Sequence, residues 1–399
     1  MSLSFKKLSS FFRCRSSHQE MSVSCVSLCI LIIFSVSTLI AHHTVIPTDR
    51  DEARFAQASK QMAETGDLVV IKFQNELRGK KPAGVYWLQS ASAKFFGPES
   101  ISSYRLPSLI AGLGTLMIIY LFAPSFGLKQ GLGQAQAAGL LLATLIFNTE
   151  TLIAKTDAVL LFFCTAMQIC LWQVYKMRHN HEEKISSFYA YGFWSALALS
   201  CLIKGPIGPL LATTTITTLC LWDRRINWLR DLRPFTGFSL FLLIAMPWYI
   251  LVTLQTDGEF IKATYEDFAT KIISGRESHG APPGFYLITL MFLFFPASLY
   301  FRHLWHGIKE TINADNGKFL VSWIVGFWLI FELTPTKLPH YVLPTFPALA
   351  ILCALGLDRL SSSVLSRKKL YIWAGFSAVI ILIFLSTLLT LINIMSEVN

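Results

Sequence analysis

Apolar runs long enough to cross a membrane recur along the whole sequence and exclude most soluble folds. As a helix, about 20 consecutive apolar residues cover the roughly 30 Å of hydrocarbon in a bilayer. Of the 399 residues, 53% are hydrophobic and only 15% are charged, against about 25% charged in soluble domains. The pattern predicts an all-α polytopic membrane protein with about eleven transmembrane helices. These spans are expected near residues 22–42, 105–122, 134–148, 156–176, 188–203, 205–222, 235–254, 284–301, 318–333, 339–357 and 370–394.

The basic residues predict how the spans are oriented. Lysine and arginine concentrate on the short loops that share a side with the N-terminus, which is typical of cytoplasmic loops. We therefore expect residues 1–21 to form a cytoplasmic tail and residues 22–399 to form a single membrane domain without a C-terminal soluble domain. The net charge of +10 indicates topology and contact with anionic membrane lipids rather than nucleic acid.

Two outer loops, 43–105 and 255–283, are predicted to carry amphipathic helices. In the first loop, Thr48 and Asp49 are candidate N-cap residues, and Pro82 stands at a favoured first helical position. Apolar residues at helical spacing predict that these helices lie along the membrane surface. The second loop repeats the amphipathic pattern.

The charged start of the first outer loop admits two interpretations. Thr48-x-x-Asp51 and Asp49-x-x-Glu52 both fit a capping box, in which the carboxylates only satisfy helix N–H groups. Asp157, at the outer end of another span, is a second acid on the same face. Two acids near several cations on one face are typical of a reaction site for an anionic lipid. Spacing alone leaves capping and catalysis both open.

Several lysines lie in tight outer turns, although basic residues are usually more frequent on the cytoplasmic side of a membrane protein. Lys155, Lys204 and Lys337 each stand in one such turn. Further cations lie in the first outer loop, namely Arg54, Lys80 and Lys81. Any single lysine can simply extend its charge to the membrane interface. Several on one face are suited to bind a phosphate at the outer leaflet.

The sequence resembles a known family over about residues 44–355. The stretch DEARFAQASKQMAETGDLVV…LRGKKPAGVYWLQSASAKFFG is similar to the first outer loop of the aminoarabinose–lipid A transferases and the wider protein mannosyltransferase-like family. TDAVLLFF, KGPIG, HGAPPGFY and KLPHYVLPTFPALA match further family segments in the same order.

The resemblance implies a GT-C fold and an inverting glycosyltransferase of the bacterial inner membrane. Its implied partners are a polyprenyl-phosphate-linked sugar donor, a lipid A, lipopolysaccharide or other envelope acceptor, and the surrounding lipids. The active site would face the periplasm and the N-terminus the cytoplasm.

The resemblance also implies roles for individual residues. Asp51 takes the position of the catalytic acid, and Asp157 that of a second acid near the site. The residues expected to bind the carrier phosphate are Arg54, Lys81, Lys204, Lys337 and Tyr341. The residues expected to support the site are Glu52, Tyr86, Glu277, His279 and His340.

The sequence leaves a metal site open. The family commonly has Glu before the Lys-Pro pair, where this chain has Lys80. No cofactor is therefore certain, and Glu277 and His279 are the remaining candidates to ligate a divalent metal.

A transporter or lipid flippase is the main alternative. Such proteins are also polytopic, and Pro247 and Pro296 could break two spans as transporter helices are broken. The sequence shows no internal repeat, and its unusual charge lies in outer loops rather than at the membrane midplane. A non-catalytic assembly partner is a third alternative, against which the presence of both Asp51 and Asp157 argues.

Overall fold

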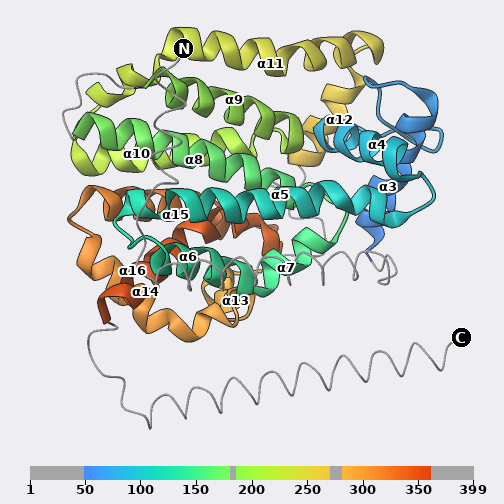
Figure 1. The fold of residues 1–399 in the computed structure, drawn as a ribbon. Helices are drawn as coiled ribbons and strands as arrows, with labels where there is room; N and C mark the ends of the chain where they lie inside the picture. The colour runs from blue at the N-terminus through green and yellow to red at the C-terminus, as the bar shows by residue number, and fades with distance from the viewer. Residues whose placement is uncertain (1–48, 180–185, 270–280, 361–399) are drawn as a thin grey trace, which may run out of the picture.

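The computed structural model describes residues 49–179, 186–269 and 281–360, and these ranges are almost entirely helical (Figure 1). The α-helices are α3 (Arg50–Thr65), α4 (Gly84–Phe96), α5 (Ile101–Phe122), α6 (Leu132–Ala143), α7 (Leu145–Leu152), α8 (Asp157–His179), α9 (Ser187–Lys204), α10 (Ile207–Asp223), α11 (Pro234–Gln255), α12 (Glu259–Ala269), α13 (Phe285–Leu293), α14 (Phe301–Thr311), α15 (Asp315–Leu333) and α16 (Phe346–Leu360). Short elements are the strands β1 (Lys72–Phe73) and β2 (Glu76–Leu77) and the 3-10 helices η1 (Ala123–Phe126), η2 (Asn227–Leu232), η4 (Ala297–Tyr300) and η5 (Pro339–Thr345).

The helices confirm the polytopic membrane class. Among the described residues, five helical segments are long and apolar enough to cross a membrane, and a sixth is added if one bent pair counts as a span. The segments are Ile101–Phe126, Asp157–His179, Pro234–Gln255, Asp315–Leu333 and Pro339–Arg359. The count of about eleven stays a prediction, because residues 1–48 and 361–399, with the expected tail and the first and last spans, lie outside the described ranges.

Two expected spans are broken. The span expected at 134–148 divides into α6 and α7 at Thr144, whose backbone is extended. The N–H of Leu145 then donates to the carbonyl of Phe295 instead of continuing the α6 ladder. The span expected at 284–301 bends by 107° between α13 and the η4–α14 segment. Pro296 lies in this break and has no N–H to offer a helix.

The first outer loop contains the two expected helices and one unexpected hairpin. Asp49 is the N-cap of α3, and Gly66 ends that helix in the left-handed conformation, which glycine adopts without strain. The antiparallel strands β1 and β2 follow, turning at Gln74 with a positive φ of 57°. Helix α4 then packs on α3 and α5, so it is held by the helical bundle.

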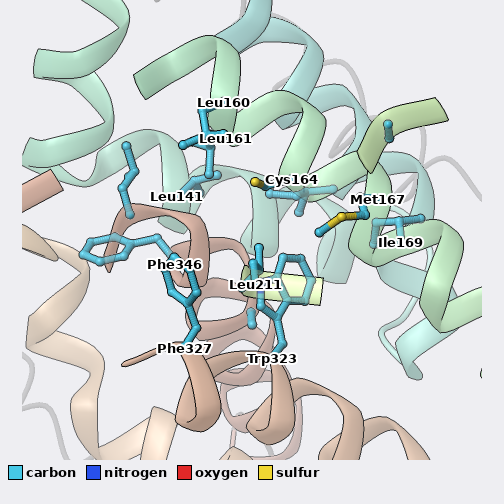
Figure 2. Close-up of a cluster of buried hydrophobic side chains, with 14 of the residues drawn as sticks. Leu141, Leu160, Leu161, Cys164, Met167, Ile169, Leu211, Trp323, Phe327 and Phe346 are labelled. Carbon is cyan, nitrogen blue, oxygen red and sulfur yellow. The ribbon is translucent and has the colours of Figure 1, made fainter. Parts of the chain in front are cut away.

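A continuous hydrophobic core holds α8 in place. Figure 2 shows Leu160 and Cys164 of α8 in the same buried cluster as Trp323 and Phe327 of α15. Helix α8 also packs along α5 and α9, and most of its side chains are buried. Because neighbours hold α8 on several sides, the first residue of this helix, Asp157, has a fixed position.

Candidate active site

A cavity of about 560 Å³ opens where the two outer loops meet the ends of the membrane helices. Its wall is formed by α3, the turn before α4, the turn before α8, the junction of α9 and α10, α12 and η5. The ionisable side chains along it are Asp51, Lys80, Lys81, Lys155, Asp157, Lys204, Asp267, His340 and Tyr341. Leu160, Ile207, Leu210, Tyr249 and Phe260 belong to its apolar part.

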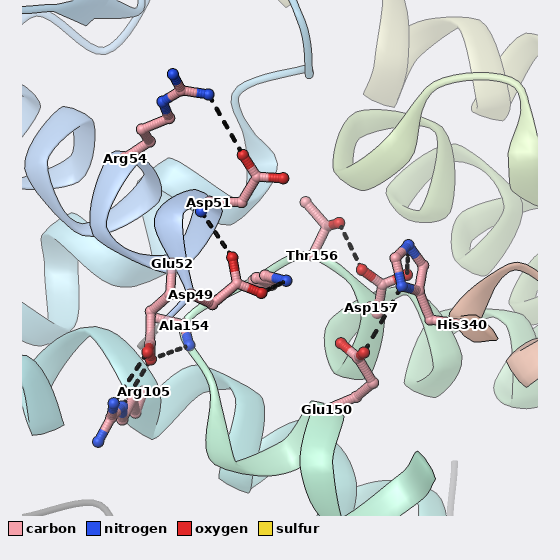
Figure 3. A network of polar contacts seen from close by, with 11 residues as sticks. Asp49, Asp51, Glu52, Arg54, Arg105, Glu150, Ala154, Thr156, Asp157 and His340 are labelled. Atoms are coloured by element: carbon pink, nitrogen blue, oxygen red, sulfur yellow. Dashed lines mark hydrogen bonds and ion pairs between the residues drawn. The ribbon is translucent and has the colours of Figure 1, made fainter. Parts of the chain in front are cut away.

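Asp157 lines the cavity and takes part in a network of polar contacts (Figure 3). Its Oδ1 accepts from Lys204 Nζ at 2.5 Å, and Thr156 Oγ1 lies 3.3 Å from its Oδ2. His340 Nε2 lies 4.0 Å from Oδ1. Lys204 ends α9, and its ammonium also lies 5.7 Å from the ring centroid of Tyr341. The structure thus gathers Asp157, Lys204, His340 and Tyr341, all expected from the sequence, around one point.

Asp51 lines the cavity from the first turn of α3. Its carboxylate is more than half exposed and lies 3.6 Å from Arg54 Nη1. The capping role belongs instead to Asp49, whose Oδ1 accepts from the Asp51 N–H at 2.7 Å. Asp49 is therefore the N-cap of α3, while the possible capping box between Thr48 and Asp51 lies partly outside the described residues.

Asp49 also fixes a cation beside the cavity by pairing with Lys155. Burial alone would raise the pKa of Asp49, but the hydrogen bonds from Lys155 and from the Asp51 N–H hold it below its usual value. Burial would likewise lower the pKa of Lys155, and its bond to Asp49 raises it. Both groups are therefore charged at neutral pH.

Glu52 is buried behind this site rather than within it. Arg105 binds it through two nitrogens, with Nε at 2.7 Å from Oε1 and Nη2 at 2.9 Å from Oε2. The Ala154 N–H also donates to Oε1 at 2.9 Å. The expected capping box through Glu52 is wrong, because these bonds occupy its carboxylate. Glu52 instead joins α3, α5 and the turn before α8, and so holds Asp51 and Asp157 on one face.

Lys80 and Lys81 connect the two outer loops. Their ammonium groups lie 4.0 Å and 3.7 Å from the carboxylate oxygens of Asp267 in α12. Gly79 permits this approach, since a Cβ there would lie 2.5 Å from that of Ala263. Thr264 Oγ1 donates to the Gly79 carbonyl at 2.7 Å. Two positive side chains therefore stand on the cavity wall beside one carboxylate.

Comparison with known proteins decides the family. The family model for dolichyl-phosphate-mannose-protein mannosyltransferase matches residues 24–256. The chain belongs to this mannosyltransferase family.

Relatives and solved structures agree with this assignment. An undecaprenyl phosphate-alpha-4-amino-4-deoxy-L-arabinose arabinosyl transferase of Aeromonas salmonicida (strain A449) is 27% identical over 76% of this chain and 55% of its own length. An uncharacterised protein of Aquifex aeolicus (strain VF5) is 28% identical over 78% of this chain and 68% of its own. The chain therefore spans roughly half to two thirds of the length of these relatives.

The fold matches a solved structure of ArnT from Cupriavidus metallidurans bound to undecaprenyl phosphate. The TM-score is 0.77 at 21% identity, over 89% of this chain and 63% of that one. An oligosaccharyltransferase of Archaeoglobus fulgidus gives a TM-score of 0.55 at 12% identity, over 89% of this chain and 54% of that one. These likenesses confirm the GT-C fold.

Arg54 and Tyr86, which the family resemblance assigned to the site, do not line the cavity. Arg54 lies beside Asp51, on the side away from Asp157 (Figure 3). Tyr86 is fully buried, accepts from Arg78 Nε at 2.8 Å, and stacks on Phe55. Burial raises the pKa of Tyr86 to about 12, so it stays protonated and supports the floor of the site.

Lys337, also assigned to the phosphate by the mannosyltransferase resemblance, is engaged elsewhere. Its ammonium donates to the carbonyls of Phe331 at 3.3 Å, Glu332 at 2.8 Å and Thr334 at 2.6 Å. Carbonyls at the end of a helix lack intrahelical partners, and lysine can satisfy them. This geometry favours a cap of α15 over a phosphate ligand. Lys337 thus binds Glu332 through its backbone carbonyl.

Glu150 is not among the residues that were expected at the site from the sequence. This residue of α7 is buried beside the cavity, with Oε1 at 3.7 Å from His340 Nδ1 (Figure 3). The turn that contains it was singled out for Lys155 and Asp157. The signal that could have found Glu150 is a second acid in the same outer turn as Asp157.

The structure does not test the two candidate metal ligands. Glu277 and His279 lie outside the described residues. Within the described ranges, no three His, Cys, Asp or Glu side chains gather as a group able to hold a metal ion.

Proposed function

We propose that this protein is a glycosyltransferase that moves a sugar from a polyprenyl-phosphate carrier to an envelope acceptor. The observation that carries this proposal is the cavity itself, which is lined by Asp51 and by Lys81, Lys155 and Lys204. The apolar wall suits the first isoprene units of a lipid carrier, and the lysines suit its phosphate. Membership of the mannosyltransferase family supports the same reaction class.

The chemistry follows from these side chains. The carrier phosphate leaves as an anion, which Lys81 and Lys204 stabilise at the position where charge develops. Tyr341 lies beside Lys204 and completes that wall. An acceptor hydroxyl needs a base, and Asp51 is the exposed carboxylate placed to accept its proton. Attack from the face opposite the carrier inverts the anomeric carbon. An acceptor phosphate is already ionised, and Asp51 then stabilises the positive charge that develops on the sugar.

We further propose that the acceptor is lipid A, lipopolysaccharide or another envelope lipid, at the periplasmic face of the bacterial inner membrane. The name of the Aeromonas relative, an arabinosyl transferase that uses undecaprenyl phosphate, supports this choice. The distribution of basic residues supports a cytoplasmic N-terminus.

Transfer by the purified protein tests the proposed function. Protein in nanodiscs would be supplied with an undecaprenyl-phosphate-linked sugar and lipid A, and mass spectrometry would detect the glycosylated product. We expect a product that depends on the protein and free carrier phosphate in equal amount. In parallel, lipid A and envelope glycans from cells with and without the gene should differ by a sugar. Identical glycans together with no release of carrier phosphate from any donor would refute the proposal.

Replacing the cavity lysines should weaken carrier binding. We expect Lys81→Ala and Lys204→Ala each to reduce the affinity for undecaprenyl phosphate by about 1–3 kcal/mol, the value of a lost charge-assisted hydrogen bond. The measurement is lipid binding to protein in nanodiscs. Lys60→Ala is the control, because Lys60 pairs with Glu99 in the same outer loop but outside the cavity. Unchanged affinity in both cavity variants would show that these lysines only anchor the protein at the interface.

The proposed orientation is testable by labelling. Cysteines introduced at Lys60 and Asn227 should react from opposite sides of the membrane with an impermeant thiol reagent. We expect Lys60→Cys to react from the periplasm and Asn227→Cys only after the membrane is opened, because the loop at 223–234 is rich in arginine. Labelling of both from one side would overturn the proposed topology.

A further inference from the structure

One buried acid has no part in the reaction described so far. The Glu150 side chain is 7% exposed, and its Oε2 is buried without a hydrogen-bond partner among the described residues. Its Oε1 faces His340 Nδ1 at 3.7 Å. A buried carboxylate without a partner is costly, so this group must hold a proton or lie beside a cation.

The neighbouring cations already have partners. The charged groups that face Glu150 are Asp157, Lys155, Lys204 and Asp49, together with His340. Lys155 pairs with Asp49, and Lys204 pairs with Asp157. Burial, and then the negative charge of Asp157, raise the pKa of Glu150 to about 8. One proton is therefore left for Glu150 and His340 together.

We propose that Glu150 and His340 share this proton, and that binding of the carrier phosphate moves it onto His340. His340 lines the cavity whereas Glu150 lies behind it. The proton leaves the Glu150 carboxyl and joins Nδ1 of His340, so the pair changes from acid and neutral imidazole to carboxylate and imidazolium. Its total charge is unchanged, and no bond to the substrate forms or breaks in this step. The inference rests on the proposed function and gives Glu150 a positioning role within it.

The shift supplies charge where the reaction needs it. When the bond between the sugar carbon and the phosphate oxygen breaks, the electron pair stays on that oxygen, and the phosphate gains one negative charge. A cation facing that oxygen lowers the energy of the transition state more than that of the bound substrate. Lys204 is already offset by Asp157 at 2.5 Å. The imidazolium of His340 instead appears in response to the phosphate.

The separation of 3.7 Å between Glu150 and His340 suits a pair that tightens on binding. Catalytic hydrogen bonds are often long in unliganded sites and shorten when the substrate is bound. The ring of His340 is also held edge-on to Tyr341, with 5.2 Å between the ring centroids. This contact keeps one nitrogen toward Glu150 and the other toward Asp157.

Infrared difference spectroscopy tests the proton shift without any requirement for sugar transfer. A protonated carboxyl has a carbonyl stretch that its carboxylate lacks. Adding undecaprenyl phosphate at neutral pH should remove this band from the wild-type protein. Neither Glu150→Gln, which has no carboxyl to titrate, nor His340→Asn, which has no proton acceptor, should show the loss. Glu332→Gln is the matched control and should behave as wild type, because Glu332 is also buried at the outer end of a helix but contacts Tyr286.

The pH dependence of turnover provides the second test. In the wild type, kcat/KM should fall as pH rises through about 8, because the pair in the free protein then loses its proton. Glu150→Gln should lower kcat about tenfold to a hundredfold with KM nearly unchanged, and should abolish this alkaline fall. His340→Asn should cost a similar factor, and the double variant little more than either single one.

The outcomes separate this inference from the proposed function. Sugar transfer without any loss of the carboxyl band in the wild type would overturn the proton shift alone, as would a band loss that persists in Glu150→Gln. The same loss of turnover at alkaline pH in the wild type and in Glu150→Gln would also overturn it. Loss of the band without transfer from any donor would instead refute the proposed reaction.

Discussion

Asp51→Asn should leave the protein folded in the membrane and reduce sugar transfer by about 10²–10⁴-fold, the usual cost of removing a well-placed general base. The geometry separates this effect from helix capping, because the carboxylate of Asp49 accepts from the backbone N–H of residue 51, which the substitution retains. Among the residues that the structure describes, the side chain of Asp51 makes one exposed contact, with Arg54. Its loss is therefore expected to have a small effect on stability.

The measurement for Asp51→Asn is initial transfer rate at equal membrane abundance. Asp67→Asn is the matched control: Asp67 lies in the same outer loop and outside the cavity. Its Oδ1 accepts from the N–H groups of Val69 and Val70, bonds that an amide oxygen can replace. The control should retain its activity. If Asp51→Asn also retains its activity, the Asp51 carboxylate is not the catalytic base.

Glu52→Gln should destabilise the protein by about 3–5 kcal/mol, the usual effect of breaking a buried ion pair from one side. Glu52 and Arg105 are each 1% exposed, so the substitution leaves a guanidinium in the interior without its counter-charge. The free energy of unfolding in detergent, or the shift in melting temperature, measures the loss.

An exposed pair and a double variant complete the Glu52 experiment. Glu99→Gln removes the largely exposed pair with Lys60 and should cost about 0–1 kcal/mol. Replacing both Glu52 and Arg105 by apolar residues should recover part of the loss, because no unpaired charge then remains. A loss below about 1 kcal/mol for Glu52→Gln would contradict the structural role assigned to it.

Periodicity and composition were enough to predict the fold class, whereas the roles of the site residues came from the family resemblance. The long apolar runs predicted the membrane helices, and the start of α3 at a charged N-cap was readable because capping is a local property. The resemblance implied that Asp51, Lys81, Asp157 and Lys204 share a site, and the structure places all four on one cavity.

What the sequence could not predict depends on contacts between distant segments. The bonds from Arg105 and Ala154 to Glu52 span 53 and 102 positions, and no local pattern specifies them. The opposite error arose at Lys337, where an isolated lysine on the outer side suggested a ligand. Its partners are backbone carbonyls only three to six positions away, and side-chain patterns do not reveal backbone acceptors.

The contacts of Glu52 join segments of the chain that are synthesised one after another. Glu52 leaves the ribosome first, its partner Arg105 follows, and Ala154 emerges only when the turn before α8 has been made. His340 and Tyr341 are made near the end of the described chain. The first outer loop is therefore made well before the later helices that pack beside it. A chain interrupted before residue 340 would contain Asp51 and Asp157 and still lack His340 and Tyr341.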